Sequence, residues 1–246
     1  MKKATYWLKE MSWHEFDHFR KQSDLVIIPG GATEVYGPHL PLGSDTLVSQ
    51  AISERVAHRV NAVIAPMLEA GESKSLSAFP GTIVIRPWSY EAVYRDIIES
   101  MIRWGFKKFL FLNMHAGNVP IISQLATEYQ MSHGIRCAQV DWWRFVQSHS
   151  EEILDRTGRA AHGHASECGT SVMMYLYPEL VDFSFADSVY PDESFYRYPD
   201  VLTYPSLEEK TKNGIVGDAT CATPEKGKAI VERCVERIVQ FVQEYF

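Results

Sequence analysis

Residues 25–45 read LVIIPGGATEVYGPHLPLGSD, and this stretch sets the expected fold. Its first five residues, 25–29, form a short apolar run rich in β-branched side chains, which is typical of a strand buried on both faces of a parallel sheet. Glycines and prolines follow at short intervals, so the chain leaves the strand in a shaped loop. That loop carries Glu34, His39 and Asp45, three side chains that can bind a metal or carry a proton.

The rest of the chain alternates strand-like and helix-like segments. Further strands are predicted at residues 62–66, 82–86, 109–112 and 136–140, and helices at 45–60, 89–104 with Ser89 as N-cap, 119–132, 164–175 and 223–246. This alternation predicts a largely parallel sheet with helices on both faces. In such sheets ligands bind beyond the carboxyl ends of the strands, where the loops after residues 29 and 112 begin. The length suits one domain, residues 1–246.

Charge, apolar runs and cysteine spacing argue against several classes of protein. The formal charge is −7 and Lys and Arg form no cluster, which argues against nucleic acid as a partner. No apolar run reaches the ~20 residues that a membrane helix needs. The four cysteines lie far apart with no CxxC pair, so a disulfide framework or zinc ribbon is not expected and a reducing cytoplasm fits best.

A second candidate segment, Asn113-Met114-His115-Ala116-Gly117-Asn118, follows the apolar strand 109–112. His115 alone reads more readily as a hydrogen-bonded core residue than as a ligand. Glu34 alone reads as a solvated loop acid, and Asp45 as the cap of the helix that follows it. Two ligand-bearing loops at neighbouring strand ends favour a metal site, and carboxylate with imidazole suits Zn, Mn or Fe.

The third candidate segment is His162-Gly163-His164-Ala165-Ser166-Glu167. His164 and Glu167 are three residues apart, so they share a face if the segment begins a helix. A purely structural helix is the alternative interpretation. No G-x-S-x-G, P-loop or G-x-G-x-x-G motif is present, which leaves covalent and nucleotide-dependent catalysis without support.

Taken in order, these segments resemble the creatininase family. The resemblance covers residues 31–45, FPGTI at 79–83, NMHAGN at 113–118, HASECGTS at 164–171 and GIVGD to ATPEKG within 214–227. It implies a three-layer αβα sandwich, commonly a hexamer, around a two-metal centre. By position, Asp45 is the bridging ligand, Glu34 and His115 complete the first metal site, Glu167 is the carboxylate of the second, and His164 is an acid/base or substrate-contacting residue.

Three positions depart from the family pattern. Tyr36 stands where the family has a histidine that binds the second metal, and Gly169 where many members have glutamate. Residues 72–75 replace a loop that is aromatic- and histidine-containing elsewhere. We therefore expect one or two divalent metals per subunit, with Tyr36 acting as a phenolate ligand or as a hydrogen-bond donor in catalysis.

The predicted function is metal-dependent hydrolysis of a small cyclic substrate. Activated water attacks a carbonyl carbon, and His164 protonates the leaving atom. Cleavage of a C–N bond in a cyclic amide or formamide is the leading prediction. Ring-opening C–C hydrolysis of an oxidised inositol, of the 3-dehydro-scyllo-inosose type, and a non-catalytic ligand-binding protein are the alternatives. Trp142, Trp143 and residues 195–198 either line the pocket or belong to the core or a subunit interface.

Overall fold

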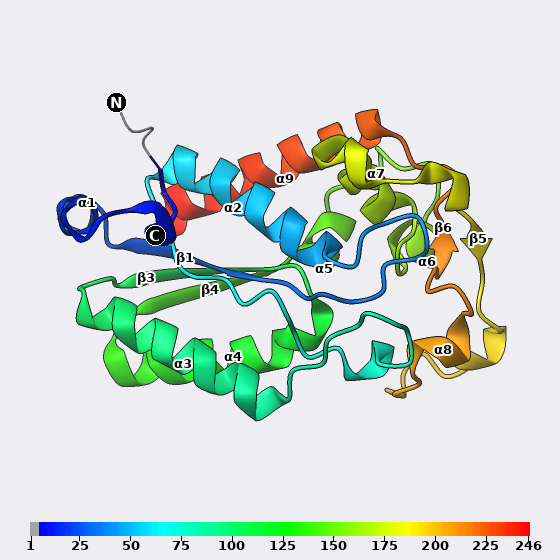
Figure 1. The fold of residues 1–246 in the computed structure, drawn as a ribbon, viewed down its shortest axis with the longest axis horizontal. Helices are drawn as coiled ribbons and strands as arrows, with labels where there is room; N and C mark the ends of the chain where they lie inside the picture. Colours follow the sequence, from blue (N-terminus) through cyan, green and yellow to red (C-terminus); the bar gives the residue numbers. More distant parts are fainter. Residues whose placement is uncertain (1–4) are drawn as a thin grey trace.

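A four-stranded parallel sheet forms the centre of the computed structural model, which describes residues 5–246 (Figure 1). The strands are β1 (Leu25–Gly30), β2 (Val63–Ile64), β3 (Lys108–Asn113) and β4 (Arg136–Asp141). Their order across the sheet is β2-β1-β3-β4, and each pair of neighbours is parallel. The strand predictions near residues 25, 62, 109 and 136 are therefore confirmed.

Side chains alternate between the two faces of the sheet, and both faces are covered. Val26, Ile28 and Phe109 belong to one buried cluster, whereas Ile27 and Leu110 belong to the other. A strand that buries both sets of side chains has no position for a polar residue, which explains the unbroken apolar runs in the sequence.

Two long helices cover each face, giving three layers (Figure 1). The helices α3 (Pro87–Arg103) and α4 (Val119–His133) bury their apolar faces in one cluster, and α2 (Ser44–Val60) and α9 (Pro224–Tyr245) bury theirs in the other. The C-terminal helix begins as expected: Thr223 accepts a hydrogen bond from the Lys226 amide, and Pro224 occupies the first helical turn. The predicted three-layer α/β architecture is confirmed.

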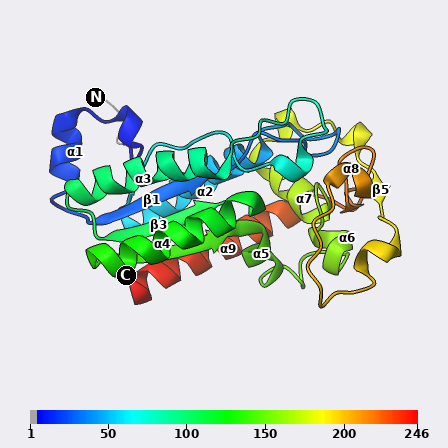
Figure 2. The same cartoon turned by 90° about the horizontal axis from the view of Figure 1, so that it is seen from below.

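The smaller elements extend beyond one end of the sheet, apart from α1 (Trp13–Phe19) at the other end (Figure 2). They are α5 (Trp142–Gln147), α6 (Gly158–His162), α7 (Glu167–Leu176), α8 (Leu207–Lys210) and the antiparallel pair β5 (Ser188–Val189) and β6 (Gly217–Asp218). Short 3-10 turns complete the chain at Leu8–Glu10, Lys74–Leu76, Ala116–Asn118, Pro178–Leu180, Phe183–Phe185 and Glu193–Tyr196.

Two local predictions were wrong. Residues 82–86 form no strand: Val84 makes only an isolated bridge to Gly71, and Ile83 is 49% exposed. This segment lies against loop backbone instead of joining the sheet, so its β-branched residues are not buried on two faces. Helix α3 begins at Pro87 with Arg86 as N-cap, earlier than the predicted cap, because proline is well suited to the first helical position.

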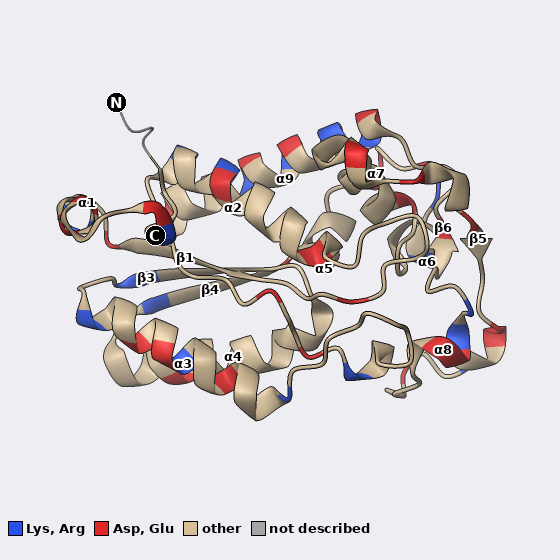
Figure 3. Cartoon of the chain, viewed as in Figure 1, with Lys and Arg blue, Asp and Glu red and all other residues tan. Residues whose placement is uncertain are grey.

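Acidic and basic residues occur together along α2, α3 and α9 (Figure 3). No helix within residues 5–246 is long and apolar enough to cross a membrane. The four cysteines are unpaired.

Candidate metal centre

Glu34, Asp45 and His115 converge at the carboxyl end of the sheet. The register pairs Gly30 of β1 with Asn113 of β3, so the loops that follow these strands leave the sheet side by side. Nδ1 of His115 lies 3.1 Å from Oε2 of Glu34 and 3.2 Å from Oδ2 of Asp45. All three side chains are buried, with at most 4% exposed, and their ligand atoms lie within 4.8 Å of one another.

This arrangement decides between the alternatives that the sequence left open. Glu34 is only 2% exposed, so it is not a solvated loop acid. Gly43 is the N-cap of α2, and Asp45 lies inside the first turn with its carboxylate directed toward His115. The site is therefore built from one loop after β1, the first turn of α2 and the loop after β3.

A backbone carbonyl determines which ring nitrogen of His115 carries the proton. Nε2 lies 2.8 Å from the carbonyl oxygen of Glu72, which can only accept, so Nε2 carries a proton and Nδ1 faces the two carboxylates. Gly117 makes this contact feasible, because a Cβ there would lie 2.0 Å from the same carbonyl oxygen. A histidine whose second nitrogen donates to a carbonyl is the usual arrangement at metal sites.

Buried polar side chains hold the surrounding loops together. Asn118 donates to the carbonyl of Gly31 and accepts from the amide of Glu72, linking the loop after β1 to the segment that contacts His115. Ser73 donates to Oε2 of Glu34 at 2.7 Å. The indole of Trp143 donates to Oδ1 of Asp45 at 3.1 Å. The roles of Asn118 and Ser73 were not predicted from the sequence, because their burial next to a ligand loop is visible only in three dimensions.

The electrostatics of the cluster favour a bound positive charge. Burial alone lowers the pKa of His115, but Glu34 and Asp45 outweigh it and raise that pKa well above 6.5. Burial raises the pKa of Asp45, and the negative charge of Glu34 adds to this effect. Burial also opposes ionisation of Glu34, yet His115 and His164 hold its pKa below the usual range. Two buried carboxylates and one imidazole therefore fit a divalent cation such as Zn or Mn.

His164 lies next to this cluster and presents one nitrogen to it. Nδ1 is 2.7 Å from the carbonyl oxygen of Gly214 and so carries a proton. Nε2 is 3.7 Å from Oε1 of Glu34 and has no hydrogen-bond partner among residues 5–246. Burial lowers the pKa of His164, but the interactions of the ring, chiefly with the carboxylate of Glu34, raise it by a larger amount. The pKa of His164 therefore lies above 6.5. The next residue, Ala165, has a φ of 51°, a left-handed conformation that is uncommon for alanine and indicates a locally constrained backbone.

Tyr36 lies between His164 and Trp143, with ring centroids 4.9 Å and 6.0 Å away. Burial, together with the charges of Asp45, Cys168 and Glu34, raises the pKa of its phenol well above 10. The hydroxyl is therefore neutral in the metal-free protein. A Cβ on Gly169 would lie only 3.0 Å from that hydroxyl, so the two departures from the family pattern, Tyr36 and Gly169, are in contact.

Glu167 does not join the cluster, and its assignment as a metal ligand is corrected by the structure. Its two carboxylate oxygens accept hydrogen bonds from the amides of Asp155 and Arg156, both at 2.9 Å. The ammonium group of Lys226 lies 2.6 Å from the same carboxylate. The prediction failed because α7 begins only at Glu167, so His164 precedes the helix and the two side chains do not share a helical face.

The remaining candidates differ in whether they face the cluster. His39 is buried and its Nε2 lies 2.8 Å from Oγ1 of Thr170. Trp142 belongs entirely to the core, whereas Trp143 and Tyr196 line the pocket above the cluster. Only part of each predicted aromatic group therefore faces the site.

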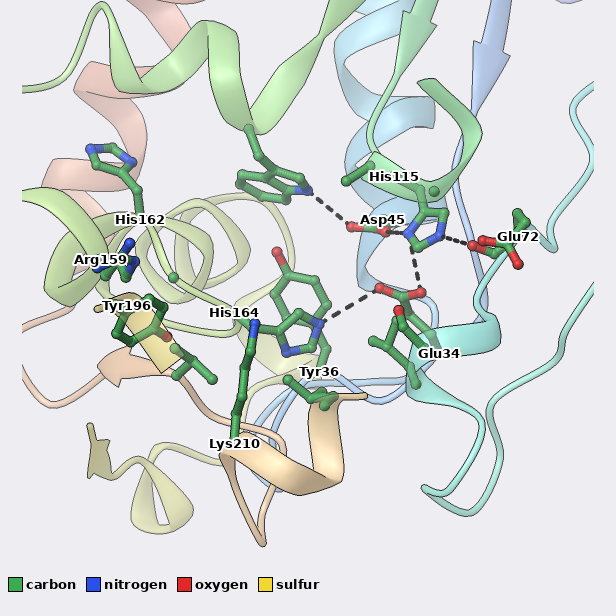
Figure 4. A pocket seen from close by; sticks show the side chains of 18 residues that line it. Glu34, Tyr36, Asp45, Glu72, His115, Arg159, His162, His164, Tyr196 and Lys210 are labelled. Atoms are coloured by element: carbon green, nitrogen blue, oxygen red, sulfur yellow. Dashed lines mark hydrogen bonds and ion pairs between the residues drawn. The ribbon is translucent and has the colours of Figure 1, made fainter. Parts of the chain in front are cut away.

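A cavity of about 380 Å³ opens over the cluster. Glu34, Asp45 and His115 lie at one end, and Tyr36 and His164 lie in the middle (Figure 4). Arg159 from α6 and Tyr196 lie at the opposite end, and the side chain of Lys210 extends from α8 toward His164; neither cation was identified as a lining residue from the sequence. The volume falls in the range of small-molecule sites.

Comparison with known proteins matches these features to one family. Residues 9–242 match the creatininase family, described as creatinine amidohydrolase. The creatinine amidohydrolase of Pseudomonas putida is 30% identical, covering 100% of this chain and 99% of its own. The 3-dehydro-scyllo-inosose hydrolase of Thermotoga maritima is 27% identical, covering 92% and 80%. A solved structure described as creatininase Mn superposes with a TM-score of 0.85 at 27% identity and covers 99% of both chains. The chain belongs to the creatininase family.

Proposed function

We propose that the protein is a metal-dependent hydrolase that cleaves a C–N bond in a small amide substrate. The observation that carries the proposal is the buried convergence of Glu34, Asp45 and Nδ1 of His115 at the floor of the cavity. The family, whose named members include an amidohydrolase, supports the reaction class. A non-catalytic binding protein would not need three ligand groups buried together with a proton-carrying histidine beside them.

Each side chain has a defined task in this proposal. Glu34, Asp45 and His115 would hold the metal, which as a Lewis acid polarises a carbonyl oxygen and activates water. The Glu72 carbonyl keeps His115 in the tautomer that directs Nδ1 to the carboxylates. His164 lines the cavity with Nε2 3.7 Å from Glu34 and without a hydrogen bond to the described residues, so this nitrogen can transfer a proton to the leaving nitrogen. The neutral hydroxyl of Tyr36 donates a hydrogen bond to the substrate.

We also propose that the centre holds one metal per chain instead of the two implied by family resemblance. Asp45 directs Oδ2 toward His115, but its Oδ1 already accepts a hydrogen bond from Trp143. Tyr36 occupies the place of the second site's histidine, with its hydroxyl against Gly169. Glu167, the expected carboxylate of the second site, is held elsewhere by Lys226.

The test is metal content measured by elemental analysis of protein purified without chelator, together with hydrolysis of a panel of lactams, cyclic imides and formamides. We expect one equivalent of Zn or Mn, and activity that disappears on chelation and returns with the metal. Metal-bound protein that hydrolyses cyclic ketones but no amide would move the assignment to C–C ring opening. Protein that binds no metal contradicts the proposal.

A variant pair tests the number of metals. Tyr36→His restores an imidazole, and Gly169→Glu adds a carboxylate for which the tyrosine leaves too little room. We expect the double variant to bind more than one equivalent, and Gly169→Glu alone to bind no more than wild type. Two equivalents in wild type would contradict the one-metal proposal and leave the hydrolase assignment intact.

We propose that the chain self-associates, because apolar side chains are exposed on its surface. Several large apolar side chains between residues 180 and 204 are exposed, including Leu202 at 82% and Tyr204 at 89%. Grouped exposed apolar residues commonly mark protein interfaces. Light scattering should show an oligomer, and Leu202→Glu should weaken it.

A further inference from the structure

The end of the cavity opposite the metal cluster carries two cations. The guanidinium carbon of Arg159 lies 3.5 Å from the centre of the Tyr196 ring, and the ammonium of Lys210 lies 6.0 Å from the same ring. All three residues line the cavity that contains the candidate metal ligands. Arg159 and Tyr196 lie across it from these ligands, and the side chain of Lys210 extends from α8 toward His164 (Figure 4). Arg159 and Lys210 therefore both lie close to the ring of Tyr196.

Neither cation has an acidic partner within residues 5–246. Other cations of the chain do: Arg156 pairs with Asp218, and Lys226 pairs with Glu167. Arg159 and Lys210 form no ion pair with any described residue.

Two acids on neighbouring segments, Glu209 and Asp192, have other contacts. Glu209, on the same helix as Lys210, accepts from the amide and hydroxyl of Ser206. Asp192 accepts from the amide of Ser194. Glu72, the remaining acid of the cavity, lies at its metal end. Burial and the positive charge of Arg159 lower the pKa of Lys210, and they outweigh the opposing negative charge of Glu209.

We propose that Arg159 and Lys210 bind a carboxylate of the substrate, so that the substrate class is a small amide that carries a carboxylate. Two like charges held together without a counterion are stabilised by an anion, and guanidinium matches a carboxylate with two parallel hydrogen bonds. The proposal rests on the hydrolase function for the position of the scissile bond, but not for the binding of the carboxylate.

Matched pairs of compounds that differ only in the carboxylate test this specificity. We would compare kcat/KM for pyroglutamate with 2-pyrrolidinone, and for dihydroorotate with dihydrouracil. A charge-assisted pair of contacts corresponds to ~10- to 100-fold preference for the acid of each pair. Lys210→Met and Arg159→Gln should each reduce that preference and raise KM more than they lower kcat.

Two matched controls lie away from the cavity. Lys212→Met removes an exposed lysine close in sequence to Lys210, and Arg103→Gln removes an exposed arginine from α3. Both should leave the preference unchanged. An equal effect of Lys212→Met and Lys210→Met would indicate general attraction of anions and would overturn the assignment.

A binding measurement separates this inference from the hydrolase proposal. Calorimetric titration of pyroglutamate and dihydroorotate into Asp45→Asn protein, which lacks a metal ligand, should show binding that the Arg159→Gln, Lys210→Met double substitution abolishes. Such binding without hydrolysis by wild type would support the carboxylate site and contradict the hydrolase. Hydrolysis of both acids at rates unaffected by the two variants would do the reverse. Absence of binding of either acid to wild type and Asp45→Asn overturns the inference.

Discussion

The two ends of the cavity are built differently. At the metal end, Glu34, Asp45 and His115 are almost fully buried, and each makes a hydrogen bond with a neighbour, namely Ser73, Trp143 and the Glu72 carbonyl, respectively. At the cationic end, Arg159 and Lys210 come from helices of five and four residues and are partly exposed. The difference separates two tasks: the sheet fixes the geometry that chemistry needs, whereas short elements added at its end determine which substrate is accepted.

The largest effect should follow from Asp45→Ala at the metal end. Loss of this central ligand should lower activity by ~10³-fold or more and reduce metal content to background. Because the substitution also removes one of two adjacent buried negative charges, the metal-free variant should unfold at a temperature no lower than that of metal-free wild type.

Elemental analysis and thermal unfolding in the presence of chelator measure both effects. Wild-type metal content in Asp45→Ala would exclude Asp45 as a ligand. A much lower unfolding temperature would instead indicate that the carboxylate has a structural role.

Gly117→Ala should have the next largest effect, because it acts on the ring of His115 without changing a ligand. Its Cβ would lie 2.0 Å from the Glu72 carbonyl and 2.7 Å from Nε2 of His115, so the hydrogen bond that orients the ring must break. Loss of such a contact typically lowers metal affinity 10- to 100-fold, and we expect about 100-fold here.

Competition with a chromogenic chelator measures this affinity. Gly134→Ala is the matched control: Gly134 has a φ of 63°, but a Cβ added there would meet no atom within 4 Å. This substitution should therefore cost about 1 kcal/mol of stability and leave metal affinity unchanged. Equal metal affinity in the two variants would show that the Glu72 contact does not matter.

The difference between the two ends of the cavity also explains which features could be predicted from the sequence. The strands could be predicted because local patterns identify them. The candidate ligands Glu34, Asp45 and His115 could be predicted because the loops that carry them follow two strand ends and resemble the family pattern. Glu167 was misassigned because spacing of three residues has meaning only within a helix, and the left-handed backbone at Ala165 separates His164 from α7.

No pattern in the sequence identified the residues of the cationic end of the cavity. Arg159 and Lys210 are far apart in the chain, and neither belongs to a motif. Their proximity depends on the path of residues 177–206, which connect α7 to α8 mostly without regular structure. Periodicity carries no information about such a path. Gly117 was equally hidden, because its importance lies in a contact with Glu72 from another loop.

A smaller, pH-dependent effect is expected at His39, which lies in the same loop as Glu34. Burial lowers the pKa of His39 to about 4, so the folded protein keeps the ring neutral while the unfolded chain binds a proton near pH 6.5. Since the unfolded state binds more protons between these values, stability falls as pH decreases through this window. The loss between pH 7.5 and pH 5 should be about 2 kcal/mol from this residue.

Urea unfolding of wild type and His39→Gln at pH 7.5, 6 and 5 isolates this contribution. Glutamine keeps a polar atom near Thr170 but does not titrate, so the stability difference between the two proteins should change by about 2 kcal/mol over this range. Substitution of the exposed His14 by Gln should leave the pH dependence of wild type unchanged. A constant difference between wild type and His39→Gln would show that the pKa of His39 is the same in the folded and unfolded protein.

The smallest effect on stability should come from Tyr196→Ala at the cationic end. The ring is only partly buried and lies on a short 3-10 turn, so its loss should change the free energy of unfolding by ~0.5 kcal/mol or less. Arg159 and Lys210 would nevertheless lose the surface that holds them together, and the preference for carboxylate substrates should fall about tenfold. Metal affinity should not change, because Tyr196 lies at the opposite end of the cavity from the three ligands. If Tyr196→Ala instead lowered metal content, the two ends of the cavity would be coupled, and the division between a fixed metal end and an independent recognition end would be wrong.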